Sequence, residues 1–343
     1  MKLGLLFIGR ESLAQIVSLG QQAEAAGFAS LYMAEVYRSG WIALSALAAA
    51  TSRVALGPYV LNAYARSPLL TGMTAIDFNE YAGGRLTLGI GGGNREINEE
   101  WQGIPHARVL TKMREYVGLL QRMARTPAGT PLRFTGQVHR MQWTPVISPR
   151  AAPFPVFLAA VFPAMLRIAA QVADGIGGGA TLSPAYLREQ LLPQAARYAV
   201  EAARDPAALR WKAVMFTAVS HARERARRAA RAALCSLFAP LPHPYYEFTM
   251  REQGYASVVE QLGKRVPAGQ LDAAIAAIPD SLVDELTIAG TSAECAVRVK
   301  SYQGLVEELI LINALPAEDG DAHAAYRELF ALAKAAEVDA PVG

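Results

Sequence analysis

The sequence predicts an α/β fold in which eight parallel strands alternate with helices and close into a (β/α)8 barrel. Two observations support this prediction: eight short apolar runs recur along the chain, and helical segments with mostly short connections separate them. Strands covered on both faces are continuously apolar, and right-handed crossovers wind consecutive parallel strands in one direction. The length of 343 residues suits a single barrel domain over residues 1–343 with insertions.

The first four strands are expected at residues 3–8, 30–33, 54–61 and 85–90. Ser12 is suited to cap the first helix, which ends before Gly27, and the second helix is expected at 41–51. Ser67-Pro68 opens the third helix, and Gly83-Gly84 closes it. A hydroxyl at the N-cap, proline in the first turn and glycine after the last turn are typical helix boundaries.

The other four strands are expected at residues 155–160, 175–178, 211–220 and 308–313. Helices are expected at 107–123, 164–172, 186–203 and 322–335. Residues 130–145 interrupt the alternation, and we expect them to form a hairpin insertion with a turn at Thr135-Gly136.

The largest insertion is expected at residues 238–289, between the seventh and eighth strands. Five prolines separate its short helical pieces: Pro240, Pro242, Pro244, Pro267 and Pro279. Insertions at this point lie near the C-terminal mouth of a barrel, where barrel enzymes place their chemistry. We expect a helical lid that shapes the substrate pocket; a role limited to packing or dimer contact is the alternative.

Composition and charge narrow the class of protein. Apolar residues make up 52% and charged residues 18%, and the formal net charge is +3, so nothing calls for a nucleic-acid partner. The arginines at 223–231 have no interleaved aromatic residues and are expected on a solvated helix face.

The longest largely apolar run, residues 41–50, is too short to cross ~30 Å of hydrocarbon. The cysteines and histidines lack metal-ligand spacing. We expect a cytoplasmic protein that acts on a small molecule and has no metal, membrane or nucleic-acid partner.

Two glycine clusters stand at strand ends, residues 89–94 after the fourth strand and 175–179 at the sixth. Glycines permit positive φ and let backbone N–H groups approach a ligand. The first cluster is not a dinucleotide fingerprint, because Asn94 replaces the final glycine and the loop follows the fourth strand. The second suits a phosphate site on a late barrel loop, with a tight barrel rim as the alternative.

Several short motifs also occur in a specific order and spacing. They are Met33-Ala34-Glu35, Val60-Leu61-Asn62, Arg66-Ser67-Pro68, residues 83–91, 99–104 and 113–117, Ala173-Asp174-Gly175 and Ala289-Gly290-Thr291. Taken together, they make the chain resemble the luciferase-like flavin- and deazaflavin-dependent oxidoreductases over nearly its whole length. The branch it resembles is the methylenetetrahydromethanopterin reductase-like group, which uses coenzyme F420.

The resemblance implies a TIM barrel that transfers a hydride between F420 and a small organic substrate, and it implies a homodimer. It also implies a non-proline cis peptide at Tyr59–Val60, behind the deazaflavin ring. The other cofactor-binding positions that it implies are Phe7, Asn62, Gly92, Gly93, Asn94, Ala160, Gly177 and Gly178, the last two at the phosphate.

One departure from the family pattern concerns catalysis. Glu35-Val36 stands where many relatives carry an acidic residue followed by histidine, so a histidine acid/base is absent there. Glu35 is the candidate catalytic residue, because a buried carboxyl group can act as a proton donor. Alternatively, Glu35 anchors an arginine or the cofactor ring. Arg66 can bind an anionic substrate or simply precede the third helix.

Two other functions remain open from the residues alone. An FMN-dependent monooxygenase shares the same barrel and phosphate loops, although the Glu35-Val36-Tyr37 segment and Asn94 favour F420. A non-catalytic barrel without cofactor is the alternative of another class, and the two glycine clusters argue against it. A hydrolase has no support, because no G-x-S-x-G motif is present.

Overall fold

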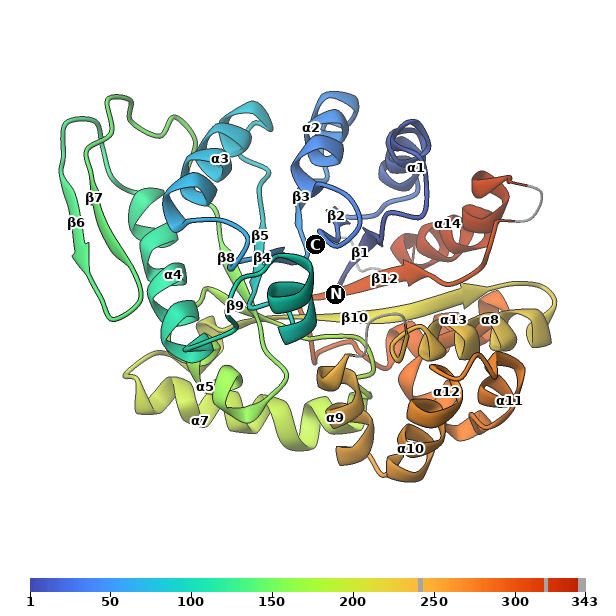
Figure 1. Cartoon of the computed structure of the whole chain (residues 1–343). Coiled ribbons are helices and arrows are strands. Elements are labelled where there is room, and N and C mark those ends of the chain that lie inside the picture. Colours follow the sequence, from blue (N-terminus) through green and yellow to red (C-terminus); the bar gives the residue numbers. More distant parts are fainter. Residues whose placement is uncertain (240–242, 318–319, 339–343) are drawn as a thin grey trace. The chain divides into compact units, whose positions relative to one another are not determined.

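The computed structural model describes residues 1–239, 243–317 and 320–338, which divide into two compact units (Figure 1). Unit 1 comprises Met1–Ser30, Gly178–Gln194 and the chain from Trp211 onward, and unit 2 comprises Leu31–Gly177 and Ala195–Arg210. Among the described residues, no helix is long and apolar enough to cross a membrane.

Unit 2 is built on parallel strands with helices between them. Its strands are β2 (Ser30–Met33), β3 (Ala55–Pro58), β4 (Leu61–Asn62), β5 (Leu88–Gly91), β8 (Val156–Ala159) and β9 (Gly175–Gly177). Strand β4 pairs with β5, β5 with β8, and β8 with β9, all in parallel, and β2 lies beside β3. The helices are α2 (Gly40–Ala50), α3 (Pro68–Tyr81), the π-helix η1 (Ile97–Trp101), α4 (Val109–Met123), α5 (Pro163–Val172), and most of α7 (Leu192–Glu201) with η3 (Pro206–Ala208).

The predicted hairpin is confirmed in unit 2. Strands β6 (Leu132–Thr135) and β7 (Arg140–Trp143) pair antiparallel beside α3 and α4 (Figure 1). Leu132 and Met141 of the hairpin form one buried cluster with Leu119 and Met123 of α4. Burial of these apolar side chains attaches the insertion to the helices.

Unit 1 contains four further strands. They are β1 (Lys2–Phe7), β10 (Arg210–Val219), β11 (Ile288–Gly290) and β12 (Glu308–Asn313). Strand β12 pairs with both β1 and β10, and β10 also pairs with β11. The helices are α1 (Leu13–Ala25), α6 (Pro184–Tyr186), the π-helix η2 (Leu187–Leu191), α8 (Arg223–Cys235), α13 (Ser292–Lys300) and α14 (Ala322–Val338). Ser12 caps α1 in a capping box with Gln15, as its position predicts.

The predicted helical insertion follows α8. It consists of α9 (Pro244–Glu252), α10 (Ala256–Arg265), α11 (Leu271–Ala276) and α12 (Asp280–Leu286), gathered together in Figure 1. Pro240 and Pro242 lie outside the described residues.

The prediction of a solvated arginine face on α8 is wrong for Arg227. This side chain is only 2% exposed, and its guanidinium bonds to the carboxylates of Asp280 (2.7 Å) and Asp284 (2.5 Å) on α12. Arg231 also bonds to Asp280, and Arg228 bonds to Asp272 on α11. The arginines therefore fix the insertion to α8, because a guanidinium can hold two carboxylates at once.

Each of the eight predicted strands overlaps an observed one. The third is divided into β3 and β4, with the bond between Tyr59 and Val60 at the break. The fourth begins at Leu88, later than predicted, since Leu86 forms only an isolated bridge to Leu56. Strand β11 was not predicted, because an apolar run of three residues is too short to be distinctive.

Candidate functional site

The site is built around a bulge between β3 and β4 of unit 2. The peptide bond between Tyr59 and Val60 is cis, as the sequence resemblance predicts. The N–H of Tyr59 donates to the carbonyl of Met33 at the end of β2 (2.9 Å). Its ring packs edge-on against Tyr32, with centroids 5.4 Å apart. The bulge is therefore held by the neighbouring strand on one side.

Strand β5 supports the bulge on its other side with glycines. A Cβ on Gly89 would lie 2.6 Å from the carbonyl oxygen of Pro58, and a Cβ on Gly91 would lie 2.7 Å from Cγ2 of Val60. Real Cβ atoms do not approach other heavy atoms that closely, so these two positions require glycine. The first glycine cluster thus serves, in part, the close packing of two backbone segments.

The end of the cluster is organised by two asparagines. The Asn62 side-chain amide donates to Oδ1 of Asn98 (2.7 Å), and the Asn98 side-chain amide donates to the backbone carbonyl of Gly92 (2.8 Å). Gly93 has φ of +62°, and a Cβ there would lie 2.8 Å from the Asn62 amide nitrogen. Asn94 accepts the N–H of Ile97 (2.7 Å) and so begins η1. These contacts fix the loop after β5 against the loop after β4.

Parts of this assembly remain accessible. Val60, Gly92 and Gly93 are partly exposed, whereas Gly89, Gly91 and Asn62 are buried. A flat ligand can therefore contact an apolar side chain and bare backbone at one place. No side chain of the loop needs to move for this, because the glycines carry none.

Glu35 and Arg66 form an ion pair beside the bulge. Nη2 of Arg66 lies 2.9 Å from Oε1 of Glu35, and the two side chains are 25% and 14% exposed. Glu35 follows β2, and Arg66 follows β4 just before the Ser67 cap of α3. Of the alternatives for Glu35, the structure contains the arginine anchor. The remaining N–H groups of the guanidinium are suited to bind an oxygen atom of a ligand.

The second glycine cluster is divided between the units. In unit 2, the N–H of Ala160 donates to the carbonyl of Gly177 (3.0 Å), and a Cβ on Gly177 would lie 2.8 Å from the Tyr59 hydroxyl oxygen. Ala160 and Gly177 therefore lie near the bulge. In unit 1, the N–H of Gly178 already donates to the carbonyl of Lys212 (2.7 Å), so this donor is used within the sheet.

Phe7 belongs to unit 1 and is fully buried at the end of β1. Its ring lies 6.1 Å from that of Tyr326, whose hydroxyl donates to Oε1 of Glu11 (2.6 Å). Burial, reinforced by the Glu11 carboxylate, raises the pKa of Tyr326 well above its usual value. Within this unit Phe7 is part of an aromatic cluster, and its contact with a cofactor stays a prediction.

The comparisons with known proteins decide the family. The sequence matches the luciferase-like monooxygenase family over residues 1–307. The chain belongs to this family. A putative coenzyme F420-dependent oxidoreductase of Mycobacterium tuberculosis is 25% identical over 343 residues, covering 93% of this chain and 96% of the relative.

Solved structures share the fold of this chain. The coenzyme F420-dependent tetrahydromethanopterin reductase of Methanopyrus kandleri has a TM-score of 0.82 at 20% identity, covering 95% of this chain and 96% of that chain. The oxygenating constituent of 3,6-diketocamphane monooxygenase from Pseudomonas putida, in complex with FMN, has a TM-score of 0.66 at 15% identity, covering 97% and 96%. The luciferase-like chain has the predicted TIM-barrel fold, and it is an oxidoreductase.

Sequence reasoning missed one residue of this luciferase-like site. Asn98 is fully buried, and it joins Asn62 to the glycine loop. Its only sequence signal is an amide residue four positions after Asn94, inside a segment rich in charged residues. A buried amide must be hydrogen-bonded, but a sequence does not show which residues will be buried.

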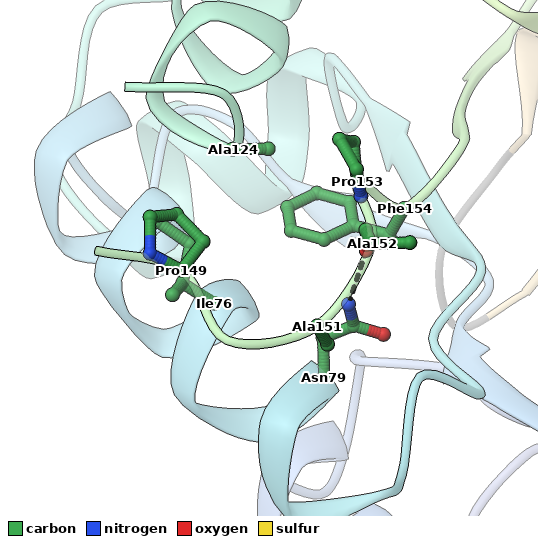
Figure 2. A pocket seen from close by; sticks show the side chains of 8 residues that line it. All are labelled: Ile76, Asn79, Ala124, Pro149, Ala151, Ala152, Pro153 and Phe154. Carbon is green, nitrogen blue, oxygen red and sulfur yellow. Dashed lines mark hydrogen bonds between the residues drawn. The ribbon is translucent and has the colours of Figure 1, made fainter. Parts of the chain in front are cut away.

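Two hollows in unit 2 lie apart from the bulge. The crevice in Figure 2 lies between α3 and the loop before β8, where the Asn79 amide donates to the carbonyl of Ala152 (2.9 Å). It has no room for a water-sized molecule, so it is a packing seam. A second cavity of about 300 Å³ lies between the hairpin and the start of α3, lined by Pro68, Leu119 and His139 among others.

Proposed function

We propose that this chain is an F420-dependent oxidoreductase that transfers a hydride between coenzyme F420 and a small organic substrate. The observation that carries the proposal is the Tyr59–Val60 bulge, packed on the glycines of β5, with Val60 and the Gly92-Gly93 backbone left accessible. A flat ring can lie on this surface because no side chain rises from the loop. F420 would supply the hydride chemistry when bound, and the protein would supply orientation.

The residues of the site divide by task in this proposal. Val60 would back the deazaflavin ring, and Asn62 would keep the glycine loop in place through Asn98. The backbone of residues 92–94 would approach the ring edge, Ala160 would contact the cofactor after β8, and Gly177 would line the phosphate end. All of these groups are fixed by contacts already present, which reduces the cost of ordering on binding.

Glu35 and Arg66 would handle the substrate. The carboxylate holds the guanidinium in one orientation, so that its free N–H groups can bind an oxygen of the substrate near the ring. Glu35 would therefore act mainly by positioning Arg66. Direct proton donation by Glu35 is the alternative. The pH–rate profiles of the wild type and Glu35→Gln distinguish the two roles, because a basic limb that is present in the wild type and lost in the variant identifies Glu35 as the proton donor.

The competing function is an FMN-dependent monooxygenase, and the FMN-bound fold neighbour favours it. Titration of the apoprotein with F420 and with FMN, followed by absorbance and fluorescence, separates the two functions. Micromolar binding of F420 with little FMN binding is the expected result. Preferential FMN binding would transfer the protein to the monooxygenase group, and binding of neither would overturn the proposal.

The proposal includes a homodimer formed through α2 and α3. These helices pack together through Trp41 and Phe78, and α2 contains no charged residue. Ile42, Leu70 and Met73 are exposed on them, and exposed apolar surface often marks protein contacts. Light scattering should give the mass of a dimer for the wild type and of a monomer for Met73→Asp; a monomeric wild type would contradict this part.

The proposed location is the cytoplasm. Cys235 and Cys295 are both free and buried, and burial raises their pKa values to about 11 and about 12. Protonated, buried thiols without a disulfide suit a reducing compartment. Localisation of a tagged full-length chain tests the assignment.

A further inference from the structure

Tyr37 and Trp101 form an exposed aromatic pair in unit 2. Their side chains are 63% and 49% exposed, and their ring centroids lie 6.0 Å apart with the planes tilted by 45°. Large aromatic residues are usually buried, because their faces bury much apolar area. Two such rings in contact with each other and with solvent therefore call for a partner.

The pair stands on two segments that also carry residues of the candidate site. Tyr37 comes two residues after Glu35, in the loop between β2 and α2. Trp101 is the last residue of η1, which begins just after the glycine loop. The C-terminal ends of parallel strands are where barrel enzymes bind their ligands. Along the chain, Tyr37 is therefore close to Glu35 of the Glu35–Arg66 ion pair, and Trp101 is close to Asn94.

Hydrogen bonds fix the segment that carries Trp101. Asn94 accepts the N–H of Ile97 at the start of η1, and Asn98 inside it bonds to Asn62 and Gly92. The Glu99 carboxylate accepts the N–H of His106 (3.0 Å), which closes the segment after the helix. π-Helical turns occur frequently at functional sites. A rigid support presents the indole without a further ordering cost.

The size of the patch indicates its occupant. Exposed polar residues stand near the pair along both segments, among them Ser39, Glu100 and Gln102, and Val36 beside Tyr37 is the one further large apolar residue of these segments that is exposed, at 39%. A stable protein interface needs roughly 800 Å² on each partner with an apolar centre, far more than two rings provide. One planar ring system of a small molecule matches two rings in area.

We infer that Tyr37 and Trp101 bind the planar aromatic or heteroaromatic part of the substrate by stacking. This inference rests on the proposed function, because it concerns the substrate of that same site. Aromatic pairs prefer offset or edge-to-face arrangements, so a tilted pair offers a platform to one ring system. The pair therefore selects flat substrates over puckered ones of equal size.

The test compares two neutral probes of one skeleton, planar 2-naphthol and its saturated, puckered counterpart 2-decalol. Calorimetry on the full-length apoprotein should give tighter binding of 2-naphthol, by about tenfold. Tyr37→Ala and Trp101→Ala should each weaken 2-naphthol binding by about fivefold and leave 2-decalol unchanged. Tyr37→Phe should retain binding, and Tyr81→Ala, which removes an exposed tyrosine from α3, is the control.

Equal binding of the two probes, or 2-naphthol binding unchanged in both alanine variants, would overturn the inference. A change of oligomeric mass in Tyr37→Ala would also overturn it, by assigning the pair to a contact between copies. Titration with F420 in parallel separates this inference from the proposed function. If F420 binds but 2-naphthol binding does not depend on the pair, only this inference is overturned. If 2-naphthol binding depends on the pair but F420 does not bind, the proposed cofactor is overturned and the stacking role of the pair stands.

Discussion

Val60 lies directly over the Cα of Gly91: a Cβ at that glycine would be 2.7 Å from Cγ2 of Val60. The bulge that contains the cis bond and the strand beneath it are therefore mutually dependent. A side chain at position 91 would displace the surface on which we propose that the cofactor ring lies.

Gly91→Ala should destabilise the protein by about 1–3 kcal/mol, because overpacking a close contact forces the backbone apart. It should also weaken F420 binding at least tenfold. The matched control is Gly118→Ala on α4, where a Cβ would meet nothing within 4 Å. Alanine there should raise stability by about 0.5–1 kcal/mol. Urea unfolding compares the two variants, and equal effects would contradict the packing argument.

The Glu35–Arg66 ion pair should show measurable coupling. A double-mutant cycle of Glu35→Gln and Arg66→Gln is expected to give a coupling free energy of unfolding of about 1 kcal/mol, since both side chains are mostly buried. A coupling energy near zero would mean that Glu35 does not hold Arg66, and the positioning role would then be lost.

Arg227 should contribute strongly to the attachment of the helical insertion. Arg227→Ala removes a buried guanidinium that bonds to Asp280 and Asp284, and should cost about 2–4 kcal/mol of unfolding free energy. Arg228→Ala, at an exposed pair with Asp272, should cost less than about 1 kcal/mol. Chemical denaturation measures both, and similar losses would show that burial is not the deciding factor.

Stability should also depend on Glu294 in acid. Its carboxylate accepts the N–H of Thr291 and bonds to Arg223, and these interactions lower its pKa from 4.5 to about 2. Because the folded pKa is the lower one, the stabilisation is complete above pH 4.5 and is lost as the pH falls towards 2. The urea midpoint of Glu294→Gln should lie below that of the wild type at pH 7, and the two should converge near pH 2. A gap that is constant with pH would contradict the assignment.

Most of the strands were predictable because they are buried apolar runs, and a fully covered parallel strand needs no other signal. The division of the third strand was not, because Val54 to Leu61 reads as one continuous run and the cis bond leaves no compositional trace. The resemblance to a family, and not the pattern of residues, predicted that bond.

The side-chain partners were harder to predict than the strands. Arg227 lies 53 residues before Asp280 and 57 before Asp284, so nothing local distinguishes it from its solvated neighbours. Glu35 and Arg66 were both candidates, but their separation of 31 residues left the pairing open. The roles of the glycines were predicted only in part. The clusters indicated the close approach of a ligand, whereas the atoms that approach Gly89 and Gly91 belong to this chain.

Hydrogen–deuterium exchange of the full-length apoprotein, with and without oxidised F420, tests the central claim most directly. We predict that F420 slows exchange in the backbone segments 58–66, 89–98 and 175–178 and leaves the hairpin at 130–145 unchanged. No change in these three segments under conditions where F420 is bound would contradict the proposed site.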